Sequence, residues 1–477
     1  MKQTECTQIE FEFQGLGRRR VVGQFDGGRV TSDGGVVLLR EFEGQRRIVQ
    51  RFAECFVDYR DPRYLEHTVA ELVGQRVFGL ALGYEDLIDH DELRWDVMLA
   101  VAVGKCDPTG AERRHQRDQG KALAGKSTLN RLELRTGDKQ RDQRYKKIEV
   151  QGEAVDRLLV DILLESYQAA PERIVLDLDG TDDPVHGNQE GRFFHGYYRE
   201  YCYLPLYIFC GAHLLCARLR TADQGERAGA IKELERIVPQ LRARWPQVPI
   251  VIRGDSSFGA EDLMKWCEEN QVDYVLGKAK NQRLVRAIGA ELEQARQACE
   301  RTGKAARVFK DFSYRTKKSW SRARRVIGKA EYLGKGANPR FVVTSLSAAE
   351  FDARRVYEEQ YCGRGDMENR IKEQQLCLFA DRTSTSLMKA NQLRLWFSSI
   401  AYVLMNEFRI QALKGTEMAK AQCSTMRLKL LKIGAVVRVS VRRVVISLAE
   451  CYPYQQLFRQ VYQNLLRQQF WPPALRG

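Results

Sequence analysis

Two apolar runs in the chain each end in an aspartate. In the first, IVLDLD, Asp177 and Asp179 lie two residues apart and therefore share one face of a predicted strand, while the leucines between them pack on the other face. The second, VPIVIRGD, ends at Asp255. If the two strands are neighbours, Asp179 and Asp255 meet at the end of a sheet. Two carboxylates so placed repel each other unless a divalent cation binds between them.

A third carboxylate is offered by a later segment, YCGRGDMENRIK. Tyr361, Arg364, Glu368 and Lys372 are spaced by three, four and four residues, which places them on one stripe of a predicted helix. This stripe presents a phenol, a guanidinium, a carboxylate and an ammonium, a set able to hold a metal ion beside a phosphate. The alternative interpretation is that Arg364 and Glu368 form only a surface ion pair.

A phosphate-binding loop is a second hypothesis. The string GKALAGKS, from Gly120 to Ser127 with Lys126 in the reactive position, satisfies the pattern G-x-x-x-x-G-K-[ST]. Such a loop needs a buried strand directly before it, and the preceding residues, ERRHQRDQ, are too polar to form one. The context therefore favours a basic loop that leads into a helix.

A phosphatase of the haloacid-dehalogenase type is a third hypothesis. The string LDLDGT resembles its signature, with Asp177 as nucleophile and Asp179 as general acid or base. Such enzymes usually carry this motif near the start of the chain and a lysine between their two acidic motifs. Here 176 residues precede Asp177, and the lysine available between the two motifs is Lys232, inside a predicted helix. Both features count against this hypothesis.

The charge of the chain indicates a polyanionic partner. Its 477 residues include 77 Lys and Arg against 62 Asp and Glu, a net charge of +15, and nucleic acid is the leading candidate partner. Residues 301–340 hold 13 basic residues against two acids and read as strands. Further basic runs occupy 112–147 and 409–443. In the basic β block we expect DNA contacts from four residues: Trp320, Arg322, Arg324 and Arg325.

The remaining patterns place these motifs in an α/β protein. Short strands with glycine turns are predicted over 1–40, helices over about 41–168, and strands over 172–225. Helix and strand then alternate, the basic β block follows, and a long helical region begins near 348. We expect no membrane span and no secretory signal. The 12 cysteines include no C-x-x-C pair, which speaks against zinc and favours a reducing cytoplasm.

Taken together, Asp179, Asp255 and the motif Tyr361-x-x-Arg364-x-x-x-Glu368 resemble the D, D and Y-R-E motifs of DDE transposases from bacterial insertion sequences. The closer resemblance is to the insertion-sequence family numbered 1380, related to the insertion-sequence 4-like group. It covers nearly the whole chain, through strings such as LDLDGTDDPVHGNQEGRFFHGYY, IRGDSSFG and YCGRGDMENRIKEQQLCLFADRTS. The sequence departs from the family at position 375, where related enzymes often carry a lysine and this chain has Gln375. Lys372, one helical turn after Glu368, would take the role of that lysine.

The resemblance implies a ribonuclease-H-like α/β catalytic core interrupted by a β-rich insertion, with a mainly helical N-terminal DNA-binding region and a helical C-terminal region. The implied divisions are 1–168 for end binding, 169–282 and 348–410 for the core, 283–347 for the insertion and 411–477 for the basic C-terminal region.

The resemblance also implies an activity. Asp179, Asp255 and Glu368 would hold two Mg²⁺ ions, or Mn²⁺ as a substitute, to cut double-stranded transposon ends and join them to target DNA. Trp320 would stack on a flipped base. We further expect a homodimer on DNA, no nucleotide cofactor and a bacterial cytoplasmic location. The string STLNRLELR is a candidate recognition helix, with Ser127 as its N-cap. Its expected DNA contacts are Lys126, Ser127, Asn130 and Arg131.

Overall fold

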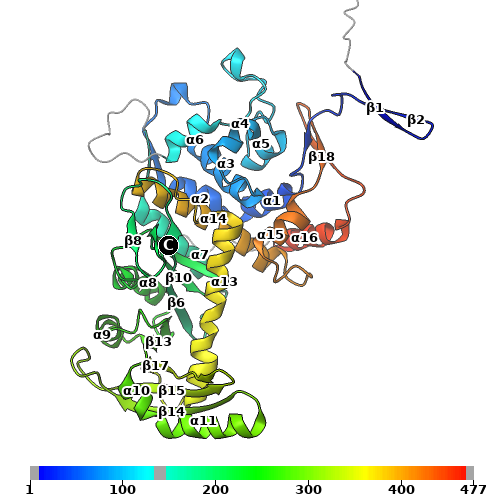
Figure 1. Ribbon diagram of the computed structural model, residues 1–477. Helices are drawn as coiled ribbons and strands as arrows, with labels where there is room; N and C mark the ends of the chain where they lie inside the picture. Colours follow the sequence, from blue (N-terminus) through cyan, green and yellow to red (C-terminus); the bar gives the residue numbers. More distant parts are fainter. Residues whose placement is uncertain (1–9, 134–146, 469–477) are drawn as a thin grey trace, which may run out of the picture.

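A large mixed sheet and a helical bundle beside it make up most of the molecule (Figure 1). The computed structural model describes residues 10–133 and 147–468. Within these residues the large sheet has nine strands in the order β11-β10-β6-β12-β13-β17-β15-β14, with β16 paired to β15. These strands are β6 Ile174–Gly180, β10 Leu206–Cys210, β11 His213–Arg218, β12 Ile250–Gly254, β13 Asp273–Lys278, β14 Ala306–Tyr314, β15 Arg324–Leu333, β16 Gly336–Ala337 and β17 Arg340–Thr344.

Strand register brings the two predicted aspartate-bearing strands together. β6 pairs in parallel with β12, so that Asp177 lies opposite Arg253 and Leu178 opposite Gly254. Asp179 follows Leu178 and Asp255 follows Gly254, so the two aspartates lie at the same end of the sheet. β12 also pairs in parallel with β13, whereas β10 runs antiparallel to β6. The neighbouring positions expected from the sequence are therefore confirmed.

The basic β block does not form a sheet of its own. β17 pairs antiparallel with β13, and β15 and β14 follow outward, so these strands extend the central sheet. The whole block lies at the bottom of the view in Figure 1, with α11 along its outer side. The predicted insertion is thus continuous with the sheet that carries the aspartates.

Helices cover both faces of the sheet and form the bundle. One face packs on α8, α9, α10 and α11, and the other on the segment 353–378 and on α14. The helices are α1 Val36–Arg46, α2 Ile48–Glu54, α3 Val69–Leu82, α4 His90–Leu93, α5 Val97–Val103, α6 Lys126–Glu133, α7 Gly152–Ser166, α8 Ala230–Arg244, α9 Glu261–Glu269, α10 Gln282–Ala287, α11 Gly289–Thr302, α12 Ala353–Arg355, α13 Gly365–Leu378, α14 Met388–Ala412, α15 Cys423–Met426 and α16 Gln455–Gln468.

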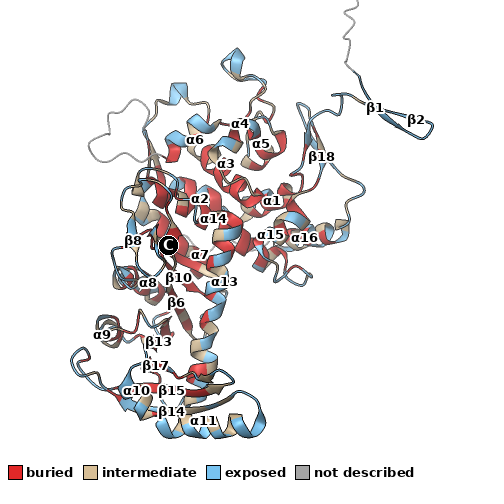
Figure 2. Ribbon diagram, in the orientation of Figure 1, coloured by how far each residue is buried: buried red, intermediate tan, exposed pale blue. Residues whose placement is uncertain are grey.

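One apolar core joins the N-terminal helices to the C-terminal region. It centres on α14, whose residues are almost all buried, and it contains side chains from α1 to α7 and from α16 (Figure 2). Short strands border it: β3 Val30–Thr31, β4 Phe56–Asp58, β5 Ile148–Val150, β18 Ala435–Val439 and β19 Val444–Leu448. By contrast, β1 Phe11–Leu16 and β2 Arg19–Gly23 form an exposed hairpin that projects away from the core (Figure 1). No described helix has the length and hydropathy needed to cross a membrane.

Two local expectations are corrected. The run VVLL at residues 36–39 begins α1 rather than a strand, because its side chains pack into the helical core. The C-terminal region is not purely helical, since β18 and β19 form a three-stranded sheet with β3. β18 pairs with β3 from near the start of the chain, a partner that no local pattern reveals.

Candidate functional site

Three carboxylates gather where β6 and β12 end and α13 begins. Asp179 and Asp255 come from the strand ends, and Glu368 comes from the first turn of α13. The Arg364 guanidinium lies between them, with Nη2 at 3.6 Å from Asp179 Oδ2 and 3.2 Å from Glu368 Oε1. The fold therefore brings together all three predicted carboxylates and one predicted basic residue, Arg364.

Electrostatics at this cluster favour a cation. Burial raises the pKa of Asp179 to about 7, and the Arg364 guanidinium opposes this rise while the Asp255 and Glu368 carboxylates add to it. Burial and nearby negative charge both disfavour the charged form of a carboxyl, and a divalent cation reverses both effects. The donor set consists of carboxylate oxygens, which Mg²⁺ and Mn²⁺ prefer.

The described residues nevertheless include no group of three His, Cys, Asp or Glu side chains already arranged around a metal position. Arg364 instead supplies positive charge to two of the three carboxylates. Its Nε is buried and forms no hydrogen bond with any residue that the structure describes. The chemistry of the donor set fits a divalent ion, and Arg364 retains a donor for a further oxygen ligand.

A glycine allows Tyr361 to approach the end of β12. A Cβ atom added at Gly277 would lie 2.7 Å from the Tyr361 hydroxyl oxygen, 2.7 Å from the backbone nitrogen of Ser256 and 2.9 Å from the carbonyl carbon of Asp255. Burial raises the pKa of Tyr361, and nearby Arg364 lowers it. The phenol therefore stays protonated and lies against the backbone that carries Asp255.

Asp177 forms a buried ion pair one layer below the carboxylate cluster. Arg253 Nε and Nη2 donate to its two carboxylate oxygens at 2.6 and 2.7 Å. Arg253 Nη1 also donates to the Gln360 carbonyl at 2.8 Å, and a Cβ on Gly363 would lie 2.6 Å from this same nitrogen. Burial raises the pKa of Asp177, and the guanidinium of Arg253 opposes that rise. The pair therefore ties both aspartate strands to the segment just before Arg364.

This tie explains a departure from the predicted helix. Tyr361 is the last residue of a π-helical stretch, Val356–Tyr361, and Arg364 is the last residue of a 3₁₀ turn, Cys362–Arg364. Of the four residues predicted to share one helical stripe, Glu368 and Lys372 lie within α13 and the other two precede it. The Gln360 carbonyl is bonded by Arg253, which competes with the regular α-helical bond to Arg364. Such π segments frequently occur at functional sites. Lys372 is exposed one helical turn beyond Glu368.

Comparison with known proteins decides the family. The family model described as "Transposase DDE domain group 1" matches residues 13–470, nearly the whole chain. The chain belongs to the DDE transposase family. It is therefore a DNA transposase, an enzyme that cleaves DNA and transfers strands. Among curated proteins no match is found. The transposase is also similar to a solved structure, the piggyBac transposase synaptic complex with hairpin DNA. Identity is 13%, the TM-score is 0.42, and the match covers 94% of this chain and 84% of that one.

The two competing hypotheses fail on the geometry of their own residues. Asp177 is 2% exposed and bound on both oxygens by Arg253, so it has no free oxygen to act as a phosphatase nucleophile. Gly120 follows a 3₁₀ turn, Gln116–Asp118, rather than a strand. Lys126 forms an ion pair with Asp91 at 3.2 Å. Neither a dehalogenase-type phosphatase nor a P-loop nucleotide site is present at these residues.

The basic β block is far less free to bind DNA than its sequence predicts. Arg324 is 5% exposed and pairs with Glu261 and Glu268 at 2.6 and 2.7 Å. Arg325 pairs with Asp311, and Arg322, although exposed, pairs with Glu268. Arg307, Lys310 and Lys329 also form ion pairs. The structure disfavours phosphate contacts by Arg324 and Arg325, because acids from neighbouring elements already neutralise them, whereas DNA contact by the exposed Arg322 stays a prediction.

We predict that Arg324→Met mainly lowers stability, by about 2 kcal/mol, since it removes charge-assisted bonds to two glutamates. It should leave the salt dependence of DNA binding nearly unchanged. Chemical denaturation and binding titrations over a range of salt concentrations measure the two effects. Lys317→Ala with Lys318→Ala, which removes two exposed charges from the same block, serves as the comparison for stability. A flattened salt slope in Arg324→Met at unchanged stability would contradict the assignment.

Trp320 is a core residue in this structure. It is 3% exposed, its ring meets Tyr314 edge-on at 5.8 Å, and the Lys278 ammonium lies 5.0 Å from its centroid. The expectation that its ring stacks on a base is corrected, because the ring packs into the core beneath the sheet. One edge of Trp320 borders a hollow of about 620 Å³ that Ser256 and Ser257 also line.

A basic groove beside Asp255 escaped the sequence analysis. Lys278, Lys280 and Arg340 line a hollow of about 310 Å³ together with Ser256 and Tyr361. No carboxylate in the described part of the chain forms an ion pair with any of these three cations. The available signal was the string GKAK directly after a predicted strand that neighbours the Asp255 strand. These cations lie beside the carboxylates rather than out in the basic β block.

The candidate recognition helix is α6. Because α6 begins at Lys126, Ser127 lies in its first turn and is not its N-cap, which corrects that expectation. Ser127, Asn130 and Arg131 are on its exposed face, and Glu133 at its other end is fully buried between Arg76 and Arg394. DNA contact by this exposed face stays a prediction. Residues 134–146, which complete the basic run 112–147, lie outside the described residues.

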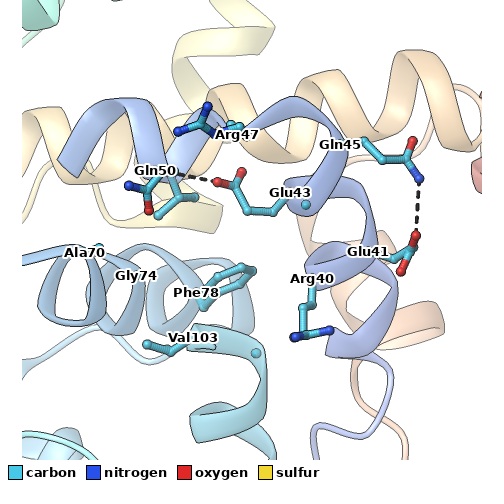
Figure 3. A pocket seen from close by; sticks show the side chains of 13 residues that line it. Arg40, Glu41, Glu43, Gln45, Arg47, Gln50, Ala70, Gly74, Phe78 and Val103 are labelled. Carbon is cyan, nitrogen blue, oxygen red and sulfur yellow. Dashed lines mark hydrogen bonds between the residues drawn. The ribbon is translucent and has the colours of Figure 1, made fainter. Parts of the chain in front are cut away.

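A separate cavity of about 600 Å³ lies in the helical bundle between α1, α2, α3 and α5 (Figure 3). Glu43 on its wall accepts a hydrogen bond from the Gln50 backbone nitrogen at 2.9 Å, while its other carboxylate oxygen is buried and forms no hydrogen bond within the described residues. Burial raises the pKa of Glu43 to about 7. The lining residues form no catalytic arrangement, and the raised pKa of Glu43 is expected to make stability depend on pH.

We predict that the free energy of unfolding falls as pH rises from about 5 to about 7, because folded Glu43 keeps a proton that the unfolded chain has already released. Glu43→Gln should make this fall shallower while it keeps the bond from Gln50. Denaturant midpoints measured across this pH range test it, with the exposed Glu417→Gln as the control variant. Identical pH profiles for Glu43→Gln and the unmodified protein would contradict the assignment.

Proposed function

We propose that Asp179, Asp255 and Glu368 are the metal-binding catalytic residues of an insertion-sequence transposase. The observation that carries this proposal is their convergence around Arg364 at the ends of two neighbouring parallel strands. Adjacent strands carry the two aspartates and a later helix carries the glutamate, as the ribonuclease-H-like core of this family implies. The cofactor is two Mg²⁺ ions, with Mn²⁺ as a substitute, and when bound they activate the attacking oxygen and stabilise the leaving oxygen.

The residues of the chain then have distinct roles. The three carboxylates bind the cations, and the Arg364 guanidinium, paired with Asp179 and Glu368, supplies positive charge beside the phosphate. Tyr361, packed on Gly277, orients the strand backbone beside Asp255. Lys372, exposed on the Glu368 stripe, contacts a flanking phosphate. No side chain forms a covalent bond to DNA, and no nucleotide is consumed.

The DNA path follows from the charges near this cluster. Lys278, Lys280 and Arg340 hold the phosphates next to the cut, because their charges are not neutralised by ion pairs and their groove borders Ser256. The exposed face of α6, with Lys126, contributes to end binding. Phosphate contacts of this kind supply affinity and position the duplex, while base contacts supply specificity.

At the level of the whole protein, we propose membership of the insertion-sequence family numbered 1380, with terminal inverted repeats as the cleaved sites and target DNA as the acceptor. Because two ends must be joined, a homodimer pairs them on DNA. The transposase acts in the bacterial cytoplasm, where its chromosomal substrate lies.

Metal titration of paired variants tests the assignment. We expect the unmodified protein to bind Mn²⁺ in calorimetric titrations and Asp179→Asn to lose this binding, because its carboxylate is a ligand. Asp177→Asn should keep most of it, because Asp177 is occupied by Arg253. DNA cleavage should require Mg²⁺ or Mn²⁺, stop in EDTA and proceed without ATP. Loss of Mn²⁺ binding in Asp177→Asn alone would transfer the ligand role to Asp177.

A further inference from the structure

A small three-stranded sheet follows β6 in the chain, directly after the strand end that carries Asp179. Four residues after Asp179 the chain enters β7 Asp183–Pro184, then β8 Phe193–His195 and β9 Glu200–Tyr203, in the order β7-β9-β8. Asp183 pairs with Tyr203 at the base of this sheet, and four residues later Tyr207 on β10 pairs with Asp179 itself. The segment that forms this sheet therefore begins and ends beside Asp179.

This sheet exposes most of its aromatic side chains on one face, while Phe193 on the other face is 41% exposed. Phe194 and Tyr201 are cross-strand partners with ring centroids 5.6 Å apart, and they are 57% and 47% exposed. Tyr197, in the connecting turn, is 82% exposed. The opposite face packs on a small buried cluster that includes Cys202 and Leu204. The exposed rings, called the aromatic face below, are Phe194, Tyr197 and Tyr201.

Charge and position indicate what covers the aromatic face. The Arg192 guanidinium lies 4.6 Å from the centroid of the Tyr201 ring, and Arg199 is exposed in the turn. Burial raises the pKa of Tyr198, and the carboxylates of Glu226, Asp182 and Asp179 add to this rise. In a transposase, DNA must lie at Asp179. Exposed rings interleaved with arginines on a sheet surface are suited to stack on unpaired bases.

We propose that the aromatic face stacks on unpaired bases of the DNA strand at the cleavage site. This inference rests on the proposed function, since it takes the carboxylates at Asp179 as the place of cleavage. Bases within a closed duplex offer no free ring face, so the stacking requires a few pairs to open near the cut. The face then holds the opened strand, while the basic groove holds the phosphates on the other side of Asp255.

Photocrosslinking tests this proposal in EDTA, so that no cleavage is needed. The probe is a duplex carrying the terminal repeat that flanks the coding sequence, with 5-iodouracil placed at successive positions around the cut. We expect crosslinks to Phe194, Tyr197 or Tyr201, mapped by mass spectrometry, at unpaired positions. The double variant Phe194→Ala with Tyr201→Ala should lose them.

The same double variant should bind a single-stranded oligonucleotide about 5- to 150-fold more weakly for each base stack it loses. Tyr201→Phe keeps a ring and should retain both the crosslink and the affinity. Tyr462→Ala removes a ring with 43% exposure on α16 and should change neither. Thermal melting checks that the exposed substitutions leave the fold intact.

Two outcomes overturn the proposal. One is that crosslinks map elsewhere and the double variant binds single strands like the unmodified protein. The other is that the double variant loses self-association in sedimentation while its crosslinks and DNA affinity are unchanged, which assigns the face to a second copy. Failure of the carboxylate assignment has a different signature, namely normal cleavage by Glu368→Gln with these crosslinks in place.

Discussion

Replacing Glu368 with Gln should reduce end cleavage by at least about 10³-fold, because a lost metal ligand removes several kcal/mol of transition-state stabilisation. Asp179→Asn and Asp255→Asn should show losses of similar size. End binding measured in EDTA should stay within a small factor of the unmodified protein, since the basic groove and α6 supply the phosphate contacts. Cleavage assays on a labelled terminal-repeat duplex, with Mg²⁺ and with Mn²⁺, measure the effect.

The matched control is Glu359→Gln, which lies in the preceding π-helical stretch, is about as exposed as Glu368 and pairs with surface Arg355 rather than with Arg364. It should cleave normally. Near-normal cleavage by Glu368→Gln in either metal would remove Glu368 from the site, and a different carboxylate of α13, such as Asp366, would have to replace it. Loss of DNA binding together with cleavage would instead indicate a folding defect, which thermal melting detects.

Breaking the Asp177–Arg253 pair should produce the largest loss of stability. Arg253→Met leaves a carboxylate that is 2% exposed without its partner, and the expected cost is about 3–5 kcal/mol. The double variant Asp177→Leu with Arg253→Met removes both charges, so its cost should be well below the sum of the two single variants. Chemical denaturation of the four proteins gives this coupling energy.

The pair should also matter for cleavage beyond its effect on folding. Arg253 holds the Gln360 carbonyl, so its loss releases the segment that positions Arg364 and Glu368. Even the stable double variant should therefore cleave poorly per folded molecule. Arg51→Met breaks a half-buried bidentate pair between α2 and Glu165 of α7, neither of which contributes to the carboxylate cluster, and should lower stability without lowering cleavage per folded molecule. Full cleavage by the double variant would show that the pair serves the fold alone.

The sequence alone determined at which ends of their strands, and on which helical stripe, the proposed catalytic carboxylates lie. A strand alternates its faces with a period of two, and parallel neighbours end at the same edge of a sheet, so IVLDLD and VPIVIRGD place Asp179 beside Asp255 once the two strands are neighbours. The parallel pairing of β6 with β12 supplies that condition. Helical periodicity likewise placed Glu368 and Lys372 on one stripe. These are local regularities of the backbone, and they hold whatever lies elsewhere in the chain.

Tertiary structure alone decided which of these charged residues are free. Asp177 and Asp179 share one face of their strand and look equivalent in the sequence. In the structure Arg253 on the neighbouring strand forms an ion pair with Asp177, whereas Asp179 belongs to the carboxylate cluster around Arg364. Arg324 looks available in a basic run, yet its partner Glu261 lies 63 residues away on α9. A sequence pattern reports which face a side chain occupies, whereas its neutralisation depends on acids brought near by the fold. For this reason we propose the basic groove beside Asp255 and the aromatic face beside Asp179 as the DNA contacts nearest the carboxylates, rather than Arg324 and Arg325 of the basic β block.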